Sequence, residues 1–298
     1  MPVNDELGKR MKEFYEAVPK TRLVRRMPVA IRIDGKAFHT FTRGFEKPFD
    51  EVLGRAMRET MKYLCENIQG CVLGYTQSDE ITLILIDYKK LTSSAWFDYE
   101  VQKMCSIAAS MATMAFNKAF ADETQRFNIE HCDVDPNGSY WDSKENQMLY
   151  NLYLEKCYKG AMFDARCFNI PKEEVANLIY WRQLDATRNS IQMVGQANFS
   201  HNELQNKSCN IIQEMLFQER DINWNDFPTH LKRGSCCVKS EATTTCAKTV
   251  DGKVITWAAE RPHWEIDLEI PIFKEEGRQY INDRILYDDG EPKPVVIF

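Results

Sequence analysis

The 298-residue sequence lacks several features that mark secreted, membrane and zinc-binding proteins. It contains no apolar run near the roughly 20 residues that a membrane-spanning helix needs, so no contact with a membrane is expected. Its first residues carry neither the charged nor the apolar region of a signal peptide, which favours a cytoplasmic protein. Ten cysteines are present. Because no CxxC pair or Cys/His zinc spacing occurs, we expect free thiols.

An excess of positive charge is also missing, since the formal net charge is −6. The sequence therefore carries no global signature of a nucleic-acid binder, although a local basic surface would be sufficient. It contains no internal repeat, low-complexity run or flexible linker. The length allows one elaborated domain or two, with a large buried core.

The first recognisable element is a strand over residues 29–34. Val29, Ile31 and Ile33 alternate with smaller or polar residues, which is the period of a half-buried strand. Asp50 is a plausible N-cap of a following helix, whose apolar residues recur at helical spacing until Gly70. The elements predicted after it are strands at 71–73 and 81–86, a helix at 99–120, a strand at 161–170 and a helix at 171–195.

This order predicts an α+β fold with a ferredoxin-like (split βαβ) polymerase-palm sheet, packed helices and a β-rich C-terminal extension. We expect a palm-like catalytic domain at 1–198 and a helix plus β-rich region at 199–298. Other expected features are an amphipathic helix at 6–24, a surface insertion at about 121–160, a helix from 200 to 217, and a hairpin turn at 251–252.

Two acids stand where predicted strands end. Asp34 precedes Gly35, a residue whose backbone can approach a ligand closely, and Asp79 lies in the turn between the next two strands. Neighbouring carboxylates repel each other, and divalent metal is the usual remedy. In palm-type polymerases and nucleotide cyclases, two such acids on a ferredoxin-like sheet hold two magnesium ions that assist phosphoryl transfer. Taken alone, a strand-end Asp-Gly is more often only a turn.

Around these acids the sequence resembles the tRNA-His guanylyltransferase family, the reverse (3′-to-5′) polymerases. The likeness extends over roughly residues 29–195, with a looser match at 232–234. The motifs that carry it, in the order of the family, are Arg32-Ile-Asp-Gly-Lys-Ala-Phe-His39, Phe45-Glu-Lys-Pro48, Tyr75-Thr-Gln-Ser-Asp-Glu80, Phe163-Asp-Ala-Arg166 and Trp181-Arg-Gln-Leu-Asp185.

The resemblance implies that Asp34, the carbonyl of Gly35 and Asp79 hold two Mg²⁺ ions, with Glu80 supporting the catalytic pair. It implies that a tRNA 5′-phosphate is activated by ATP or GTP, and that the 3′-hydroxyl of an incoming nucleotide then attacks it. It also suggests a homo-oligomer, a tetramer by family likeness. The residues expected to contact nucleotide are Asp34, Gly35, Lys36, Ala37, Phe38, His39, Lys47, Ser78, Asp79 and Lys103.

One departure from the family indicates a branch. The segment 187–193 keeps only Asn189 of the eukaryotic His-Ile-Asn-Asn-Leu-Tyr-Asn pattern. It is instead similar to the bacterial, archaeal and phage tRNA-His guanylyltransferase-like proteins, for which the implied task is template-dependent repair of 5′-truncated tRNAs. Addition of one guanosine to histidine tRNA is the alternative within the family. A palm-fold nucleotide cyclase and a non-enzymatic RNA-binding protein are alternatives outside it.

Several residues carry weaker hypotheses. RNA contacts are expected at Arg32, Arg188, Asn189, Lys232 and Arg233, although a solvated surface explains the last two equally well. Trp181 is expected in the core rather than as a base-stacking surface. The remaining candidates are given structural explanations: 131–133 as a loop without metal, and 236–237 as part of a strand.

Overall fold

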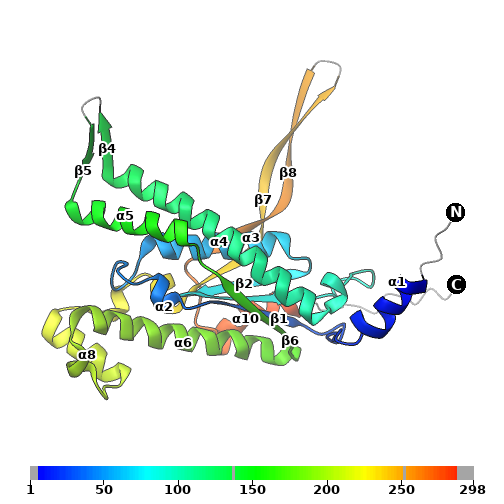
Figure 1. Ribbon diagram of the computed structural model, residues 1–298, viewed down its shortest axis with the longest axis horizontal. Coiled ribbons are helices and arrows are strands. Elements are labelled where there is room, and N and C mark those ends of the chain that lie inside the picture. The colour runs from blue at the N-terminus through cyan, green and yellow to red at the C-terminus, as the bar shows by residue number, and fades with distance from the viewer. Residues whose placement is uncertain (1–5, 136–137, 251–252, 287–298) are drawn as a thin grey trace.

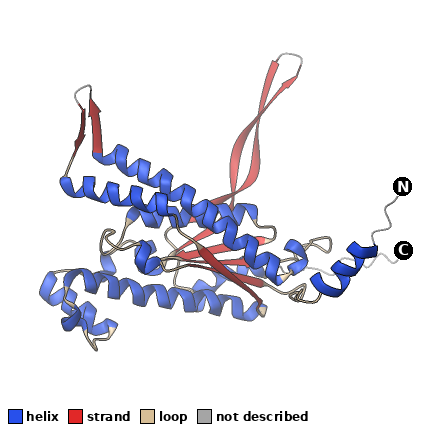
Figure 2. Ribbon diagram, viewed as in Figure 1, coloured by secondary structure: helices blue, strands red, loops and turns tan. Residues whose placement is uncertain are grey.

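A single antiparallel sheet of six strands lies at the centre of the molecule (Figures 1 and 2). The computed structural model describes residues 6–135, 138–250 and 253–286. The order across the sheet is β6-β1-β3-β2-β7-β8. The bounds of these strands are β1 Val29–Gly35, β2 Cys71–Gln77, β3 Glu80–Leu85, β6 Phe163–Asn169, β7 Ser235–Val250 and β8 Lys253–Asp267.

Long helices cover both faces of this sheet. In Figure 1, α4 and α5 cross above the sheet and α6 lies below it, while the β7–β8 hairpin projects away from the body. The principal helices are α2 Phe38–Phe41, α3 Glu51–Asn67, α4 Val101–His131, α5 Lys144–Lys159, α6 Lys172–Asn198, α8 Cys209–Arg220, α9 Thr229–Arg233 and α10 Gln279–Ile285.

The face toward α3 and α4 is apolar and rich in aromatic rings. Strand residues such as Ile31, Ile33 and Leu83 are fully buried there. Phe120 of α4 lies 5.4 Å from Phe41 and 5.7 Å from Phe116 between ring centroids. The rings of this cluster are Phe38, Phe41, Phe45, Phe116, Phe120 and Tyr153. Edge-to-face and stacked contacts of this kind add to the stability gained from burying apolar area.

The face toward α6 is apolar only in part. Ala30 and Ile84 pack there against Val175 and Ile179 of α6, together with α10. Toward the end of β1 at Asp34, charged side chains replace the apolar ones on the same face. The alternation of β1 therefore separates two different environments, as the sequence pattern predicts.

The region expected as a surface insertion belongs partly to the core. α4 does not end near 120 but continues to His131, because its buried stripe continues through Glu123 and Phe127. A two-stranded hairpin follows, β4 Cys132–Asp135 with β5 Gly138–Trp141, and places 132–133 in a strand rather than a loop. α5 then returns along α4, and its Tyr153 is fully buried.

Two other helices were predicted too long, in contrast to α4. Residues 6–24 contain a short exposed α1 (Glu6–Met11) followed by a π-helical turn, not one continuous helix. The capping box of Ser200 is confirmed, but it opens α7, which ends at Leu204. Ser208 then caps α8, so the predicted helix over 200–217 is two helices.

The C-terminal β-rich region is confirmed as a long hairpin. β7 begins beside β2, where Cys236 and Cys237 are buried in the sheet as predicted. The predicted turn at 251–252 lies outside the described residues. The cysteines whose side chains the structure describes are free thiols. No helix among the described residues combines the length and apolar character required to cross a membrane.

Candidate active site

The end of β1 and the turn between β2 and β3 are joined at the two predicted acids. The backbone N–H of Gly35 donates a hydrogen bond of 3.0 Å to the carbonyl of Asp79. Asp34 lies opposite Glu80 of β3 and opposite Asp164 of β6 in the register of the sheet. Side chains that lie directly opposite on one face are neighbours. The fold therefore brings several carboxylates to one end of the sheet.

Asp79 is held in a half-buried position within this group. Ser78 Oγ donates a hydrogen bond of 3.1 Å to its Oδ1. Burial raises the pKa of Asp79 above its usual value, and the charges of Asp34 and Glu80 raise it further, against the lowering effect of its hydrogen bonds. An acid that is costly to ionise beside other acids favours a bound cation.

Backbone conformation on both sides of the acid pair is unusual. Ala37 has φ 55° and Ser78 has φ 50°, both in the left-handed region that non-glycine residues rarely adopt. Strain of this kind often marks functional sites. Gly35 is required for packing, because a Cβ there would lie 2.2 Å from the buried ring of Phe38.

A cavity of about 550 Å³ opens beside the acid pair. Its volume is within the range of small-molecule sites. The predicted nucleotide contacts that line it are Gly35, Ala37, Phe38, His39, Lys47, Ser78 and Asp79. A smaller hollow of about 120 Å³ adjoins it and shares Asp50 and Ser78 in its wall.

Other predicted contacts lie outside this wall. Asp34 belongs to the acid pair on the α6 face of the sheet, and Lys36 is exposed, with its N–H bonded to the carbonyl of Met162. Lys103 lies in the first turn of α4, with Nζ 4.8 Å from the ring centroid of Phe97. The structure thus brings Lys47, but not Lys103, to the cavity.

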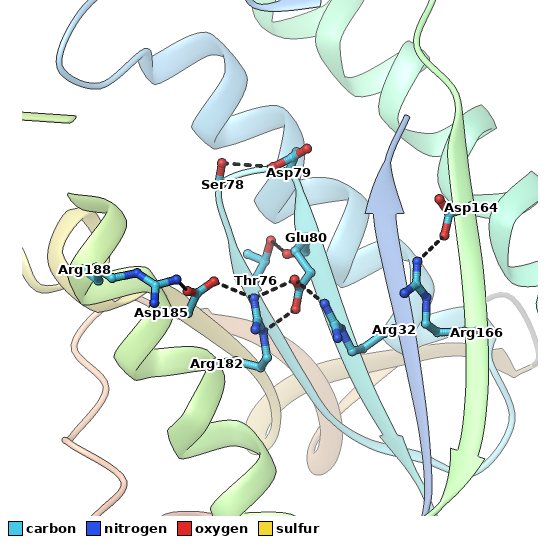
Figure 3. Close-up of polar contacts among 10 residues, drawn as sticks. All are labelled: Arg32, Thr76, Ser78, Asp79, Glu80, Asp164, Arg166, Arg182, Asp185 and Arg188. Carbon is cyan, nitrogen blue, oxygen red and sulfur yellow. Dashed lines mark hydrogen bonds and ion pairs between the residues drawn. The ribbon is translucent and has the colours of Figure 1, made fainter. Parts of the chain in front are cut away.

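Glu80 does not face a cation site, because two arginines occupy its carboxylate (Figure 3). Its Oε1 lies 2.6 Å from Nε of Arg182, and its Oε2 accepts from Nη2 of Arg182 at 2.7 Å and of Arg32 at 2.8 Å. Thr76 Oγ1 donates to its backbone carbonyl at 2.9 Å. Glu80 therefore anchors the strand that follows Asp79.

The ion pairs continue outward along α6. Arg182 Nη2 lies 2.8 Å from Oδ2 of Asp185, and Asp185 also binds the exposed Arg188. On the edge strand β6, Arg166 Nη2 donates to Asp164 at 3.1 Å. The hydrogen bond and charge of Asp164 raise the pKa of Arg166 above its ordinary value. The site end of this face is thus lined by guanidinium groups.

The predicted RNA contacts are scattered around this network. Arg32 is tied to Glu80, while Asn189 lines the smaller hollow. Lys232 and Arg233 lie in α9, whose backbone is bound through Tyr75 Oη to the carbonyl of Arg233 at 2.8 Å. The prediction for Trp181 was wrong, since this side chain is 52% exposed.

Several residues of the site had no role in the sequence prediction. Asp50 was expected only as an N-cap, which it is, with Oδ1 accepting from the N–H of Leu53 at 2.8 Å. It also lines both hollows and accepts from Tyr153 Oη at 2.6 Å. Asp164, Arg166, Arg182 and Asp185 stand within recognised motifs, and those motifs were the signal that could have identified them.

The sequence itself matches one protein family over most of the sheet and its helices. Residues 8–171 match the family described as tRNAHis guanylyltransferase (Thg1). The chain belongs to this family. Membership makes it a nucleotidyltransferase and confirms the resemblance found in the motifs.

Individual relatives agree with this assignment. A bacterial tRNA(His) guanylyltransferase-like protein solved in complex with ATP is 38% identical, with a TM-score of 0.74, and the match covers 94% of this chain and all of that one. A second such structure, in complex with GTP, is 36% identical with a TM-score of 0.70, covering 95% of this chain and all of that one. The tRNA(His) guanylyltransferase of Saccharomyces cerevisiae is 26% identical over 70% of this chain and 80% of its own length.

Proposed function

We propose that this enzyme adds nucleotides to the 5′ end of tRNA in the 3′-to-5′ direction, using a template, after ATP or GTP activates the 5′-phosphate. The observation that carries the proposal is the cavity of about 550 Å³ beside Asp79, lined by the motif residues of a nucleotidyltransferase family. Its relatives of known structure hold ATP and GTP. Positioning and charge stabilisation are sufficient for such phosphoryl transfers.

The donor set suits magnesium. Asp34, Asp79 and the carbonyl of Gly35 are the hard oxygen ligands that Mg²⁺ prefers, and Mg²⁺ commonly takes only one or two carboxylates and completes its shell with phosphates and water. Within the described residues no group of three or more His, Cys, Asp or Glu side chains forms a closed metal site. Two bound ions would polarise the phosphates and offset charge as it develops.

The chain's own residues would position the nucleotide. Lys47 and His39 line the cavity on the side of α2, and Ser78 lines it on the side of the turn. We propose that Lys47 contacts phosphate and that Ser78 orients Asp79 through its 3.1 Å hydrogen bond. Glu80, fixed by Arg32 and Arg182, would act as a positioning residue for this turn.

The strand order supports a palm assignment. The run β6-β1-β3-β2 places the fourth, first, third and second strands of the βαββαβ unit side by side, which is the ferredoxin-like order. We propose that residues 1–198 form the palm-like catalytic domain and that 199–298 form an appended region.

The repair branch is favoured over single-guanosine addition. Among solved structures, identity to the bacterial guanylyltransferase-like protein is 38%, against 22% to the Saccharomyces cerevisiae enzyme. Asn189 alone survives of the eukaryotic segment. The substrate we propose is therefore a tRNA that lacks 5′ nucleotides and keeps the opposite strand as template.

A direct assay tests this function. The enzyme is incubated with 5′-monophosphorylated tRNA lacking its first nucleotide, Mg²⁺, ATP and each labelled nucleotide in turn. We expect incorporation of the nucleotide complementary to the template, and none with Asp79→Ala. Incorporation of guanosine alone, into histidine tRNA regardless of template, would favour the single-addition alternative. A cyclic product formed without RNA would contradict the proposal.

A further inference from the structure

One tryptophan of the described chain departs from the burial of its counterparts. Trp96, Trp224 and Trp264 are at most 9% exposed and Trp141 is partly buried, whereas Trp181 of α6 is 52% exposed. Its ring is flanked by guanidinium groups, with Cζ of Arg182 4.5 Å and Cζ of Arg32 5.6 Å from the ring centroid. A half-exposed indole fixed beside two cations is a surface prepared for a planar ligand.

The position of Trp181 relates it to the acid pair. Arg32, which lies over its ring, is two residues before Asp34 on the same face of β1. Arg32 is opposite Arg166 of β6 in the sheet register, and the side chain of Arg166 is 57% exposed. The indole therefore lies on the α6 side of the sheet, close to the end that carries the acids.

The same helix continues this surface toward solvent. Trp181, Asp185 and Arg188 are separated by four and three residues, so they follow one stripe of α6. The side chain of Arg188 is 61% exposed and is held in place by Asp185. About 10 Å of helix separates Trp181 from Arg188, at a rise of about 1.5 Å per residue.

We infer that Trp181 stacks an unpaired base of the RNA acceptor end, while Arg166 and Arg188 contact its phosphates. This inference depends on the proposed function and names a contact for its substrate. Bases that are free of a pair stack on aromatic rings, whereas paired bases are not available for it. A tRNA that has lost 5′ nucleotides carries such bases on its template strand.

The surroundings favour RNA over other occupants. The nucleotide cavity is lined by α2, the turn at Asp79 and the end of α6, and Trp181 is not part of its wall. Arg32 and Arg182, which flank the indole, are paired with Glu80. Arg166 and Arg188 on the same side are 57% and 61% exposed, and their guanidinium groups complement phosphate.

Binding of two RNA hairpins tests the inference. One is a 5′-monophosphorylated acceptor-stem hairpin lacking its first two nucleotides, so that the template bases are unpaired. The other is the complete stem with the same 3′ end. Affinities are measured by fluorescence anisotropy at one fixed salt concentration, for the wild type, Trp181→Ala, Trp181→Phe and Phe217→Ala. Phe217 is the matched control, an aromatic residue of α8 that is 54% exposed.

We expect Trp181→Ala to weaken binding of the truncated hairpin by about 5- to 150-fold, the range found for loss of one stacked base. Binding of the complete stem should change by less than about 3-fold, since its bases are paired. Trp181→Phe should retain most of the affinity for the truncated hairpin. Phe217→Ala should bind both hairpins as the wild type does, and Trp181→Ala should bind ATP with unchanged affinity.

Other outcomes overturn the inference. No loss with Trp181→Ala, or an equal loss for both hairpins, would exclude stacking on an unpaired base. A change in oligomeric state of Trp181→Ala in light scattering would assign the indole to an interface between copies. If the wild type binds neither hairpin, the proposed function itself fails, which distinguishes that failure from failure at Trp181.

Discussion

At one end of the molecule, the two faces of the central sheet differ in chemistry, with aromatic packing on one face and ion pairs on the other. On the α4 side, Phe38, Phe41 and Phe45 pack against Phe116 and Phe120 with ring centroids between 5.4 and 5.9 Å apart. On the α6 side, Arg32 of β1 and Arg182 of α6 both form ion pairs with Glu80 of β3. The boundary between them runs through β1, where Ile33 and Asp34 point to opposite sides.

The aromatic face stabilises the backbone around the site, whereas the charged face positions the acids. The aromatic face fixes the backbone of residues 37–48, part of which lines the cavity that we propose for nucleotide, and this packing needs no charge. The charged face fixes where Asp79 stands by anchoring Glu80, the next residue, from two elements. Buried ion pairs contribute little net stability, but removal of one partner is costly because it leaves an uncompensated buried charge.

The largest expected effect comes from opening the aromatic face. Phe120→Ala removes a ring that is 1% exposed and contacts four others. We expect the free energy of unfolding to fall by about 3–5 kcal/mol, as for other buried phenylalanines. Urea unfolding measures it. Met114→Ala on the same helix, 56% exposed, is the control and should change stability by less than about 0.5 kcal/mol. If Phe120→Ala lowered the free energy of unfolding by less than about 1 kcal/mol, the aromatic cluster would contribute little to stability.

The next effect comes from breaking the charged face. Arg182→Leu leaves Glu80 buried with Arg32 as its remaining partner. We expect a loss of about 3 kcal/mol, at the low end for a broken buried pair because one arginine remains. Nucleotide affinity should fall by roughly 10-fold or more, since the turn at Asp79 loses its anchor.

Arg188, at the exposed end of the same series of ion pairs, provides the matched variant. The side chain of Arg188 is 61% exposed, so Arg188→Leu should cost less than about 1 kcal/mol. Differential scanning calorimetry and ATP titration compare the two variants. Equal losses of stability in both would mean that this series of ion pairs has no anchoring role at Glu80.

The smallest expected effect distinguishes two lysines. Lys47 lines the cavity and Lys103 does not, although both were predicted to contact phosphate. We expect Lys47→Ala to weaken ATP binding by about 5-fold, which corresponds to roughly 1 kcal/mol for one exposed charge contact. Lys103→Ala should leave it unchanged. Calorimetric titration with ATP checks both. A larger loss of affinity with Lys103→Ala would indicate that the phosphates bind near α4 and would contradict the proposed site.

Much of this arrangement could be predicted from local pattern. Alternation at Val29–Ile33 and the N-cap at Asp50 gave the strand and the helix that position the acids, because short-range periodicity and capping are written in neighbouring residues. The acid pair was also predictable, since strand ends and turns are local features.

The charged face could not be predicted in the same way. The pairing of Glu80 with Arg182 joins residues 102 positions apart and leaves no periodic trace. The exposure of Trp181 depends on which stripe of α6 faces the sheet, and the sequence of one helix does not decide this. α4 was predicted to end near 120 because its last three turns, roughly, are polar by composition, although Glu123 is buried against Arg55 at 2.8 Å.

The central claim is that Asp34 and Asp79 hold metal ions at the phosphates of a bound nucleotide. Burial raises the pKa of Asp79, so ionisation of this group at neutral pH destabilises the folded protein when no metal is bound. The free energy of unfolding therefore rises as the pH falls through the raised pKa. Asp79→Asn should remove this pH dependence and raise the melting temperature in EDTA.

The most direct measurement is the melting temperature of the wild type and of Asp79→Asn at neutral pH, in EDTA and with Mg²⁺ plus a non-hydrolysable ATP analogue. We predict that Asp79→Asn melts higher in EDTA. With ligands at about 100 times their Kd, the wild type should gain about 2.7 kcal/mol and the variant almost nothing. An Asp79→Asn variant that is less stable in EDTA, or that responds to Mg²⁺ and nucleotide as the wild type does, would contradict the claim.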